Sequence, residues 1–300
     1  MAKIIISVDN TADYMKDFMQ KNGIYCIPVK RIQNDEVHTD IFNGDSEFEA
    51  FYEQIKKGAL PTTSQTNPDE FIEYFNNILA NEQSGDIIHI TLSGGLSGTY
   101  NSAVAAANAV NEKQNGRKVY VVDSLLVNGA IQLMANKLLE IRDKTDADMA
   151  VEAITDIRDH TQGHFMVDDL FHLHRGGRVS RAKAIIGSIL GVKPMLTVDN
   201  VGKLSVVGKV KGGKRGIEYL MNLLREHDVD KTEYAGQDIF CVRTTQSDTF
   251  RELVDTVKKT YPKAKVTEQC LGTVIASHVG AGMVAIIFRG KSRFEEKPKA

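Results

Sequence analysis

The chain has 300 residues, of which 42% are hydrophobic and 25% are charged, a composition typical of folded proteins and a length sufficient for two domains. Its 37 Lys and Arg residues nearly balance 39 Asp and Glu residues, so the net charge of −2 provides no bulk field for binding nucleic acid or an anionic lipid surface. The three cysteines, Cys26, Cys241 and Cys270, are widely spaced, which indicates a reducing compartment rather than a disulfide framework or a thiolate metal site.

The N-terminal sequence and the hydropathy pattern exclude two kinds of targeting. Before Asp9 there is only a short isoleucine run, which is too short for the apolar region of a secretory signal. No segment approaches the roughly 18 to 20 uninterrupted apolar residues that a membrane span requires. We therefore expect a cytoplasmic protein without stable membrane insertion.

The first half of the chain alternates short β-branched runs with longer amphipathic stretches, which is typical of a mainly parallel sheet with helices on both faces. The clearest helix start is Asn67-Pro68-Asp69-Glu70, where Asn67 caps the helix, Pro68 occupies its first position and Glu70 reaches back to the cap. Strands are expected at Ile4–Val8, Cys26–Ile32, Asp86–Leu92 and Val119–Val122, and helices at 12–22, 46–57, 68–81, 99–111, 127–142 and 147–160.

The second half reads as a mixed or antiparallel sheet with helices on one face. Strands are expected at Phe165–Val167, around 170–174, and at Met195–Val198, Lys203–Lys211, Phe240–Arg243, Ala264–Cys270 and Met283–Phe288, with helices at 180–190, 213–227 and 247–260. The sequence therefore predicts a two-domain α/β protein, with an N-terminal domain of residues 1–160 and a C-terminal domain of residues 161–295.

The loops of the first half share one chemical character. Hydroxyl-bearing and small residues stand beside expected helix starts in four strings: 9–11, 62–66, 93–99 and 123–124. Ligands of parallel sheets bind beyond the carboxyl ends of the strands, and helix N-termini favour an anion. These loops therefore indicate a site for one small anionic group, a carboxylate or a phosphate, although hydroxyls at such positions also serve as caps.

Two other motifs are candidate ligand sites. The string 280–285 matches the dinucleotide fingerprint GxGxxA, but it precedes a β-branched run instead of a helix, so a tight turn is the better interpretation. His160, His164, His172 and His174 lie close together in sequence, and the last two would share one face of a strand. Without a third-ligand pattern, we expect packing or solvated histidines rather than a metal site.

The string Gly95-Leu96-Ser97-Gly98-Thr99 is close to the nucleophile elbow of serine hydrolases. The elbow requires GxSxG, and Thr99 stands where the last glycine should be. Asp123 and His278 follow Ser97 in the order of an α/β-hydrolase triad. A hydrolase or acyltransferase that uses Ser97 is therefore an alternative function.

Several strings in the same order along nearly the whole chain resemble the DegV family of bacterial fatty-acid-binding proteins. They are Ser7–Asp13, Pro61–Gln65, Leu92–Ala103, Val121–Ser124, His174–Ser180, Val192–Pro194, Lys209–Gly212 and Ser277–Gly282.

The resemblance implies two α/β domains that clasp one long-chain fatty acid (C16 to C18), with no other cofactor. It also implies a non-catalytic subunit of fatty acid kinase, which presents the carboxylate to a separate ATP-dependent kinase subunit for acyl phosphate formation. The residues that it implies as carboxylate ligands are Thr63, Ser64, Ser93, Gly94 and Ser97, with His278 closing the network from the second domain. A neutral cradle of hydroxyls and amides would leave one carboxylate oxygen reactive, whereas a buried bidentate arginine would hold both.

The sequence also departs from the family pattern. Many relatives have a second serine where Gly94 stands, so Ser93 or a backbone amide has to supply that contact. Relatives also often have arginine where Lys211 stands and proline where Thr66 stands. Arg175, Arg178 and Arg181 form a basic cluster that, together with Lys211, is a candidate for docking the kinase subunit or else a solvated turn. A module for another small carboxylate or phosphate ligand is the remaining alternative.

Overall fold

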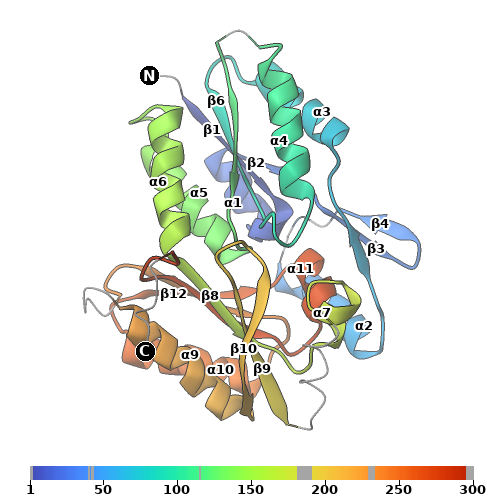
Figure 1. Cartoon of the computed structure of the whole chain (residues 1–300), viewed down its shortest axis with the longest axis vertical. Coiled ribbons are helices and arrows are strands. Elements are labelled where there is room, and N and C mark those ends of the chain that lie inside the picture. Colours follow the sequence, from blue (N-terminus) through green and yellow to red (C-terminus); the bar gives the residue numbers. More distant parts are fainter. Residues whose placement is uncertain are drawn as a thin grey trace. The chain divides into compact units, whose positions relative to one another are not determined.

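The computed structural model (Figure 1) describes residues 3–39, 41, 44–114, 116–180, 191–228 and 234–294. Its contacts divide the chain into two units. Unit 1 comprises Met1–Glu47 and Pro61–Arg158, and unit 2 comprises Phe48–Leu60 and Asp159–Ala300.

The segment Phe48–Leu60, which the predicted boundary near residue 160 leaves in the first domain, is part of unit 2. Helix α2 (Asp45–Lys56) has Phe48, Phe51, Tyr52 and Ile55 at helical spacing, and all four side chains are buried. The Tyr52 hydroxyl donates a hydrogen bond of 2.5 Å to the carbonyl of Leu271. This aromatic face fixes α2 to unit 2.

The main sheet of unit 1 has four parallel strands in the order β2-β1-β6-β7, as predicted for this half of the chain. The strands are β1 (Ile4–Asp9), β2 (Ile24–Ile27), β6 (Asp86–Thr91) and β7 (Val119–Asp123). Because all four run in the same direction, the loops that follow them leave from the same edge of the sheet.

Helices cover both faces of this sheet (Figure 1). On one face, α3 (Pro68–Asn81) and α4 (Thr99–Asn111) pack phenylalanines and alanines against Ile5, Ile87 and Val119. On the other face, α5 (Gly129–Ile141) contacts β1 and β6. The capping box predicted at Asn67 and Glu70 is confirmed. The remaining helices of unit 1 are η1 (Asn10–Ala12), α1 (Lys16–Asn22) and the greater part of α6 (Ala147–His160).

The single strand predicted over Cys26–Ile32 is wrong, because the chain changes sheets at Pro28. The side chain of Asn10 pairs with the backbone of Val29: its amide nitrogen donates to the Val29 carbonyl at 3.2 Å, and its oxygen accepts from the Val29 amide at 2.9 Å. These bonds end β2 in the main sheet. A second, antiparallel sheet then forms in the order β4-β3-β5, from β3 (Lys30–Gln33), β4 (Glu36–His38) and β5 (Thr62–Ser64).

Unit 2 is built on a six-stranded mixed sheet in the order β10-β9-β8-β13-β11-β12; among its described strand pairs, β11–β12 is parallel and the others are antiparallel. The strands are β8 (Thr161–Met166), β9 (Val192–Val198), β10 (Leu204–Lys211), β11 (Asp238–Arg243), β12 (Lys265–Cys270) and β13 (Val284–Arg289). A mixed or antiparallel sheet was predicted for this half.

One face of the unit 2 sheet packs against helices α9 (Gly213–His227) and α10 (Asp248–Thr260), where Met166, Met195 and Ile286 join the core. Side chains alternate between the faces of a strand. The opposite face therefore carries a second apolar set, Leu196, Phe240, Val242, Ala285 and Ile287.

Two segments of unit 2 differ from the sequence prediction. The strand expected around 170–174 is helix α7 (Phe171–Arg175), because the carboxylate of Asp169 accepts the amide of Phe171 at 2.8 Å and starts a helical turn. Helix α11 (Thr273–Val279) was not predicted. In the string 280–285, where a tight turn was expected, the chain bends at 281–282 between Gly280 and Gly282, which have φ angles of 75° and 83°, and Val284 and Ala285 already belong to β13. The helix expected at 180–190 lies, apart from Ser180, outside the described residues.

Across the part of the chain that the structure describes, no helix has both the length and the apolar character needed to cross a membrane.

Candidate functional site

Three loops of unit 1 follow the carboxyl ends of β1, β6 and β7 and are joined by hydrogen bonds. The carboxylate of Asp9, at the end of β1, accepts the amide of Leu92 at 2.7 Å. The amide of Ser93, just after β6, donates to the carbonyl of Leu126 beyond β7 at 2.9 Å. The strings 9–11, 93–99 and 123–124 therefore lie at one edge of the sheet.

Asp9 is the buried anchor of this edge. Besides the Leu92 amide, its carboxylate accepts the amide of Thr11 at 2.9 Å and the hydroxyl of Thr11 at 2.5 Å. Burial raises the pKa of Asp9 to about 6, even though these hydrogen bonds favour the charged form. Because Asp9 holds the residue that precedes Ser93, it acts as a structural carboxylate of the loop.

The Asp123 carboxylate accepts the hydrogen bond of the Gly94 backbone amide, which was expected to bind a ligand. The amide of Gly94 donates to both of its carboxylate oxygens, at 3.2 and 3.1 Å, and the amide of Leu125 donates to Oδ1 at 2.8 Å. A Cβ atom on Gly94 would lie 2.8 Å from Asp123 Oδ2 and 2.9 Å from the ring of Tyr100. Glycine at this position therefore admits Asp123, and the Gly94 amide can bind a ligand only when that carboxylate turns away.

The two serines of the 93–99 loop hold it in shape. Ser93 is completely buried, and its hydroxyl oxygen accepts the amide of Gly95 at 3.1 Å. The Ser97 hydroxyl accepts the amide of Thr99 at 3.2 Å and lies 2.9 Å from the Thr99 hydroxyl. The described contacts of Ser97 thus favour a turn at the start of α4 over an activated nucleophile.

The predicted ligands Thr63 and Ser64 lie on β5, directly before a residue that reaches this loop. The side-chain oxygen of Gln65, which directly follows β5, occupies the position that a Cβ atom would take on Gly98. The absence of a side chain at Gly98 leaves room for the Gln65 side chain in this position. Two strings of the family resemblance, 61–65 and 92–103, therefore contact each other in unit 1.

Arg31 is a residue of this region that the sequence reasoning missed. In the antiparallel pair of β3 and β5, Arg31 lies directly opposite Thr63, and its exposed fraction is only 7%. Directly opposed residues of such a pair point to the same face. The sequence did show a strand-like pattern over 26–32. It does not show that Arg31 pairs with Thr63, which lies 32 residues further along the chain.

His278, the predicted ligand from the second domain, lies on α11 in unit 2. A Cβ atom on Gly176, which ends α7, would overlap Nδ1 of the His278 ring. Burial, followed by the charges of Arg178 and Arg175, lowers the pKa of His278 to about 4. The imidazole is therefore neutral near pH 7 and donates a hydrogen bond through only one of its ring nitrogens.

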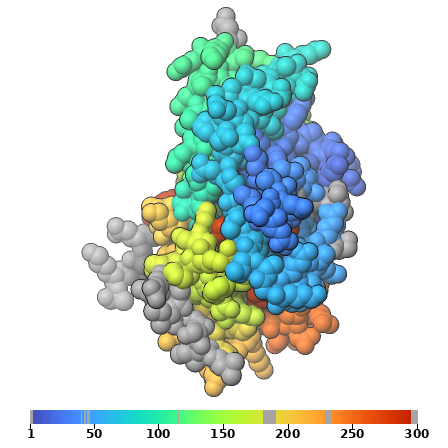
Figure 2. Space-filling model, turned by 90° about the vertical axis from the view of Figure 1, so that its right-hand side faces the viewer, coloured from blue at the N-terminus to red at the C-terminus, as the bar shows by residue number. Residues whose placement is uncertain are grey.

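Two further glycines complete the packing between the segments 168–178 and 278–282. A Cβ atom on Gly280 would overlap the His172 ring, and one on Gly282 would overlap the Asp168 carboxylate. Two more strings of the resemblance, 174–180 and 277–282, therefore pack against each other. In this interlocked packing, side chains of one segment lie against glycines of the other. Figure 2 shows α7 and the following turn, in yellow-green, at the surface.

The predicted docking residues are distributed along unit 2. Arg175 donates to the carbonyl of Ser277 at 3.3 Å, and Arg178 donates to the carbonyl of Gly176 at 2.5 Å. Both arginines therefore stabilise the interlocked segments. Lys211 ends β10 and is exposed, and Arg181 lies outside the described residues.

A metal site among the histidines of this region has no support in the described residues. His172 and His174 lie on helix α7, so the prediction that they share one face of a strand is wrong. The described parts of both units contain no group of three or more His, Cys, Asp or Glu residues that could hold a metal ion.

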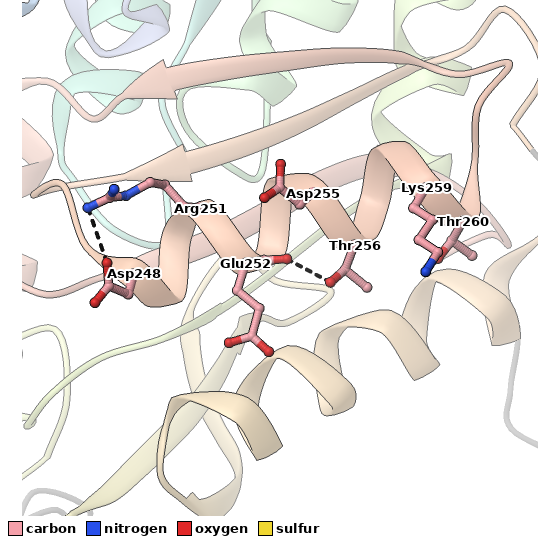
Figure 3. A pocket seen from close by; sticks show the side chains of 7 residues that line it. All are labelled: Asp248, Arg251, Glu252, Asp255, Thr256, Lys259 and Thr260. Carbon is pink, nitrogen blue, oxygen red and sulfur yellow. Dashed lines mark hydrogen bonds and ion pairs between the residues drawn. The ribbon is translucent and has the colours of Figure 1, made fainter.

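A shallow hollow of about 830 Å³ runs along the outer side of α10. All seven lining residues belong to this one helix, and Figure 3 shows their side chains spread along it, with Arg251 paired to Asp248 and the Thr256 hydroxyl donating to the Glu252 carbonyl. A hollow with charged walls on a single helix has neither the enclosure nor the apolar lining that a hydrophobic ligand needs.

The fold and the loops define a two-unit α/β protein with hydroxyl-bearing loops at the carboxyl edge of a parallel sheet. A family model described as "Uncharacterised protein, DegV family" matches residues 3–291. The chain belongs to the DegV family.

Similar proteins match over almost the whole chain. A DegV domain-containing protein of Clostridium perfringens is 32% identical over 299 residues, which cover 98% of this chain and 99% of that protein. The structure of a DegV lipid-binding protein from Thermotoga maritima is 31% identical, covers 97% of this chain and 99% of that chain, and has a TM-score of 0.81. The structure of DegV, a fatty acid binding protein from Bacillus subtilis, is 29% identical, covers 97% and 100%, and has a TM-score of 0.83.

Proposed function

We propose that this chain binds one long-chain fatty acid and presents its carboxylate to a separate kinase subunit. The observation that supports fatty acid binding most strongly is the match of 97% and 96% of this chain to solved DegV proteins described as fatty acid binding, from Bacillus subtilis and Thermus thermophilus. The hydroxyl-bearing strings that were interpreted as an anion site lie together in unit 1. Both observations favour a carboxylic acid over other lipids.

The proposed carboxylate ligands are the hydroxyl groups of Thr63, Ser64, Ser93 and Ser97. The Gly94 amide joins them only when the Asp123 carboxylate turns away from it. A hydrogen bond to an ionised acceptor contributes about 1.5 to 3 kcal/mol. His278 of unit 2 is proposed to donate a further hydrogen bond as a neutral imidazole.

The acyl chain supplies most of the binding free energy. Each buried methylene contributes about 0.8 kcal/mol, so a C16 chain gives on the order of 10 kcal/mol of gross transfer free energy. The proposed contact surface for the chain in unit 2 is the apolar sheet face opposite α9 and α10, which carries Phe240, Val242 and Ile287. We therefore expect affinity to depend on the apolar surface and orientation to depend on the hydroxyls.

The proposed reaction takes place on the partner. A kinase subunit in the cytoplasm would transfer the terminal phosphoryl group of ATP to the carboxylate, and this chain would hold the acid in position. Arg175, Arg178, Arg181 and Lys211 are the proposed docking residues, because a positively charged surface attracts an acidic partner surface.

Thr63→Ala tests this division of roles. The variant should reduce acyl phosphate formation by a fatty acid kinase subunit by about tenfold or more, because it removes one charge-assisted hydrogen bond. It should change lipid retention much less. The matched control is Thr62→Ala, because Thr62 is the exposed neighbour on the opposite face of β5. Loss of bound lipid in a folded Thr63→Ala protein would contradict the proposed division.

A further inference from the structure

One of the Asn-Gly pairs of the chain, Asn128 and Gly129, stands at the start of α5 with an unusual backbone. Asn128 has φ 55° and ψ −125°, which lies outside the regions that L-residues ordinarily occupy. Tetrahedral geometry places the nitrogen and the Cβ atom of an L-residue about 120° apart around the Cα–C bond. With ψ at −125°, the Cβ atom of Asn128 therefore nearly eclipses the nitrogen of Gly129.

This conformation brings the side chain of Asn128 against the next peptide nitrogen. The Gly129 amide donates to Oδ1 of Asn128 at 2.6 Å, so the side-chain carbonyl carbon that carries this oxygen lies beside the same nitrogen. A succinimide ring consists of the Gly129 nitrogen and four carbons of Asn128: the backbone carbonyl carbon, Cα, Cβ and Cγ. The folded backbone already has the eclipsed arrangement of that ring, and glycine has no Cβ atom to obstruct the approach of its nitrogen.

Hydrogen bonds hold Asn128 in this arrangement. Its backbone amide donates to the carbonyl of Thr11 at 2.8 Å. Its backbone carbonyl accepts the amides of Ile131 at 2.9 Å and Gln132 at 3.2 Å. Its side-chain nitrogen donates to Oδ2 of Asp13. These contacts fix the torsion that ring closure requires, and fixing reacting groups in position is what accelerates an intramolecular reaction.

We propose that Asn128 and Gly129 form a site of spontaneous covalent modification, at which the folded chain converts Asn128 to a succinimide. The Gly129 nitrogen attacks Cγ of Asn128 and loses its proton as the N–Cγ bond forms. The bond between Cγ and Nδ2 breaks, and Nδ2 leaves as ammonia with that proton. Water would open the ring to aspartate or isoaspartate, but Asn128 is completely buried, so the succinimide is the product expected in the folded protein.

The modification acts at the edge of the sheet that carries the candidate site, although it does not depend on the proposed fatty acid binding. Asn128 follows β7, and Asp13 follows β1. Ring closure removes the side-chain donor that Asn128 gives to the Asp13 carboxylate. It therefore weakens the connection between these two segments.

The chain provides a matched control, because Asn22 and Gly23 are the same dipeptide in a different conformation. Asn22 is the last residue of α1, and the Gly23 amide donates to the carbonyls of Met19 and Gln20. The side-chain nitrogen of Asn22 donates to the carbonyl of Phe18 at 2.9 Å. In a helix ψ is about −42°, so the nitrogen of Gly23 is far from eclipsing the Cβ atom of Asn22.

Peptide mass spectrometry tests the proposal on the full chain. The purified protein is incubated for several days at mildly alkaline pH, either folded or unfolded in urea, and is then digested with pepsin at low pH, which preserves succinimides. The summed fraction of succinimide, aspartate and isoaspartate is measured at residues 128 and 22. In the folded protein the reaction at Asn128 should be about tenfold or more faster than at Asn22, whereas the two rates should be similar in urea.

The ratio of the two rates decides the outcome. A ratio in the folded protein that is no greater than the ratio in urea would overturn the proposal, because the fold would then protect Asn128 instead of promoting its reaction. The absence of any detectable reaction at Asn128 in the folded protein would overturn it as well.

Discussion

The contact between Gly176 and His278 gives a quantitative prediction about unit 2. Gly176 has φ −73° and ψ −3°, a conformation that alanine adopts without strain. The cost of Gly176→Ala therefore comes from packing. The new methyl group would overlap His278 Nδ1, lie 3.2 Å from Cε1 of the same ring and lie 3.3 Å from the carbonyl of His172. Inserting a methyl group into a filled site typically costs about 1 to 3 kcal/mol, and we expect a loss of stability in this range.

A double-mutant cycle isolates the contact. In a His278→Ala background the ring is absent, so Gly176→Ala should cost little, and the coupling between the two positions should equal most of the single-variant cost. The chain has no tryptophan, so unfolding by urea is followed by far-ultraviolet circular dichroism. If the two substitutions are additive, or if Gly176→Ala is as stable as the wild type, the interlocked packing of the segments 168–178 and 278–282 is refuted.

Three further predictions concern unit 1. Gly94→Ser should displace the Asp123 carboxylate, because a Cβ atom at residue 94 would lie 2.8 Å from Asp123 Oδ2; it should lower the free energy of unfolding by about 1 to 3 kcal/mol, and an unchanged urea midpoint would contradict this. Gly85→Ala should cost about 2 kcal/mol or more, because Gly85 has a φ of 111° and a Cβ atom would overlap the carbonyl of Lys3; thermal unfolding near the wild-type temperature would refute it. Burial lowers the pKa of His89 from 6.5 to about 3, so between these values the unfolded chain binds a proton that the folded chain does not, and stability should fall by about 1.4 kcal/mol for each pH unit of acidification. His89→Gln should flatten this acid branch, and an equally steep branch in the variant would show that other groups cause it.

The sequence predicted those elements whose signals are local. The capping box of Asn67 and Glu70 lies within four residues, and the helix starts where this box predicts. The run Asp86–Leu92 is apolar enough to identify a strand buried on both faces, and it is the central strand β6. Its position between β1 and β7 also explains why loops with similar residues meet at one edge.

The wrong predictions depend on contacts between distant residues. The split of 26–32 is caused by the Asn10 side chain, whose bonds to Val29 replace the main-sheet pairing. The alternation of apolar residues with His172 and His174 resembles a strand, but the hydrogen bond from the Phe171 amide to Asp169 starts a helix. The seven-residue helix α11 is stabilised mainly by its packing, since so short a helix is marginal by itself.

In the candidate site, too, the local sequence strings were predicted and the contact between distant residues was not. The strings 61–65 and 92–103 were identified from their hydroxyls and glycines, and the structure brings them together through Gln65 and Gly98. Arg31 was missed because its proximity to Thr63 exists only through the strand register. The roles of Thr63, Ser64, Ser93, Gly94, Ser97 and His278 as carboxylate ligands stay predictions.

Native mass spectrometry of the freshly purified protein, followed by solvent extraction, is the most direct test of the central claim. We expect one long-chain fatty acid per chain, and the extract would identify its length and unsaturation. A mass without ligand that stays unchanged after incubation with C16 and C18 acids would contradict the claim. That result would shift the assignment to a site for a shorter carboxylate or phosphate, or to Ser97 chemistry, which labelling of Ser97 by a fluorophosphonate probe would reveal.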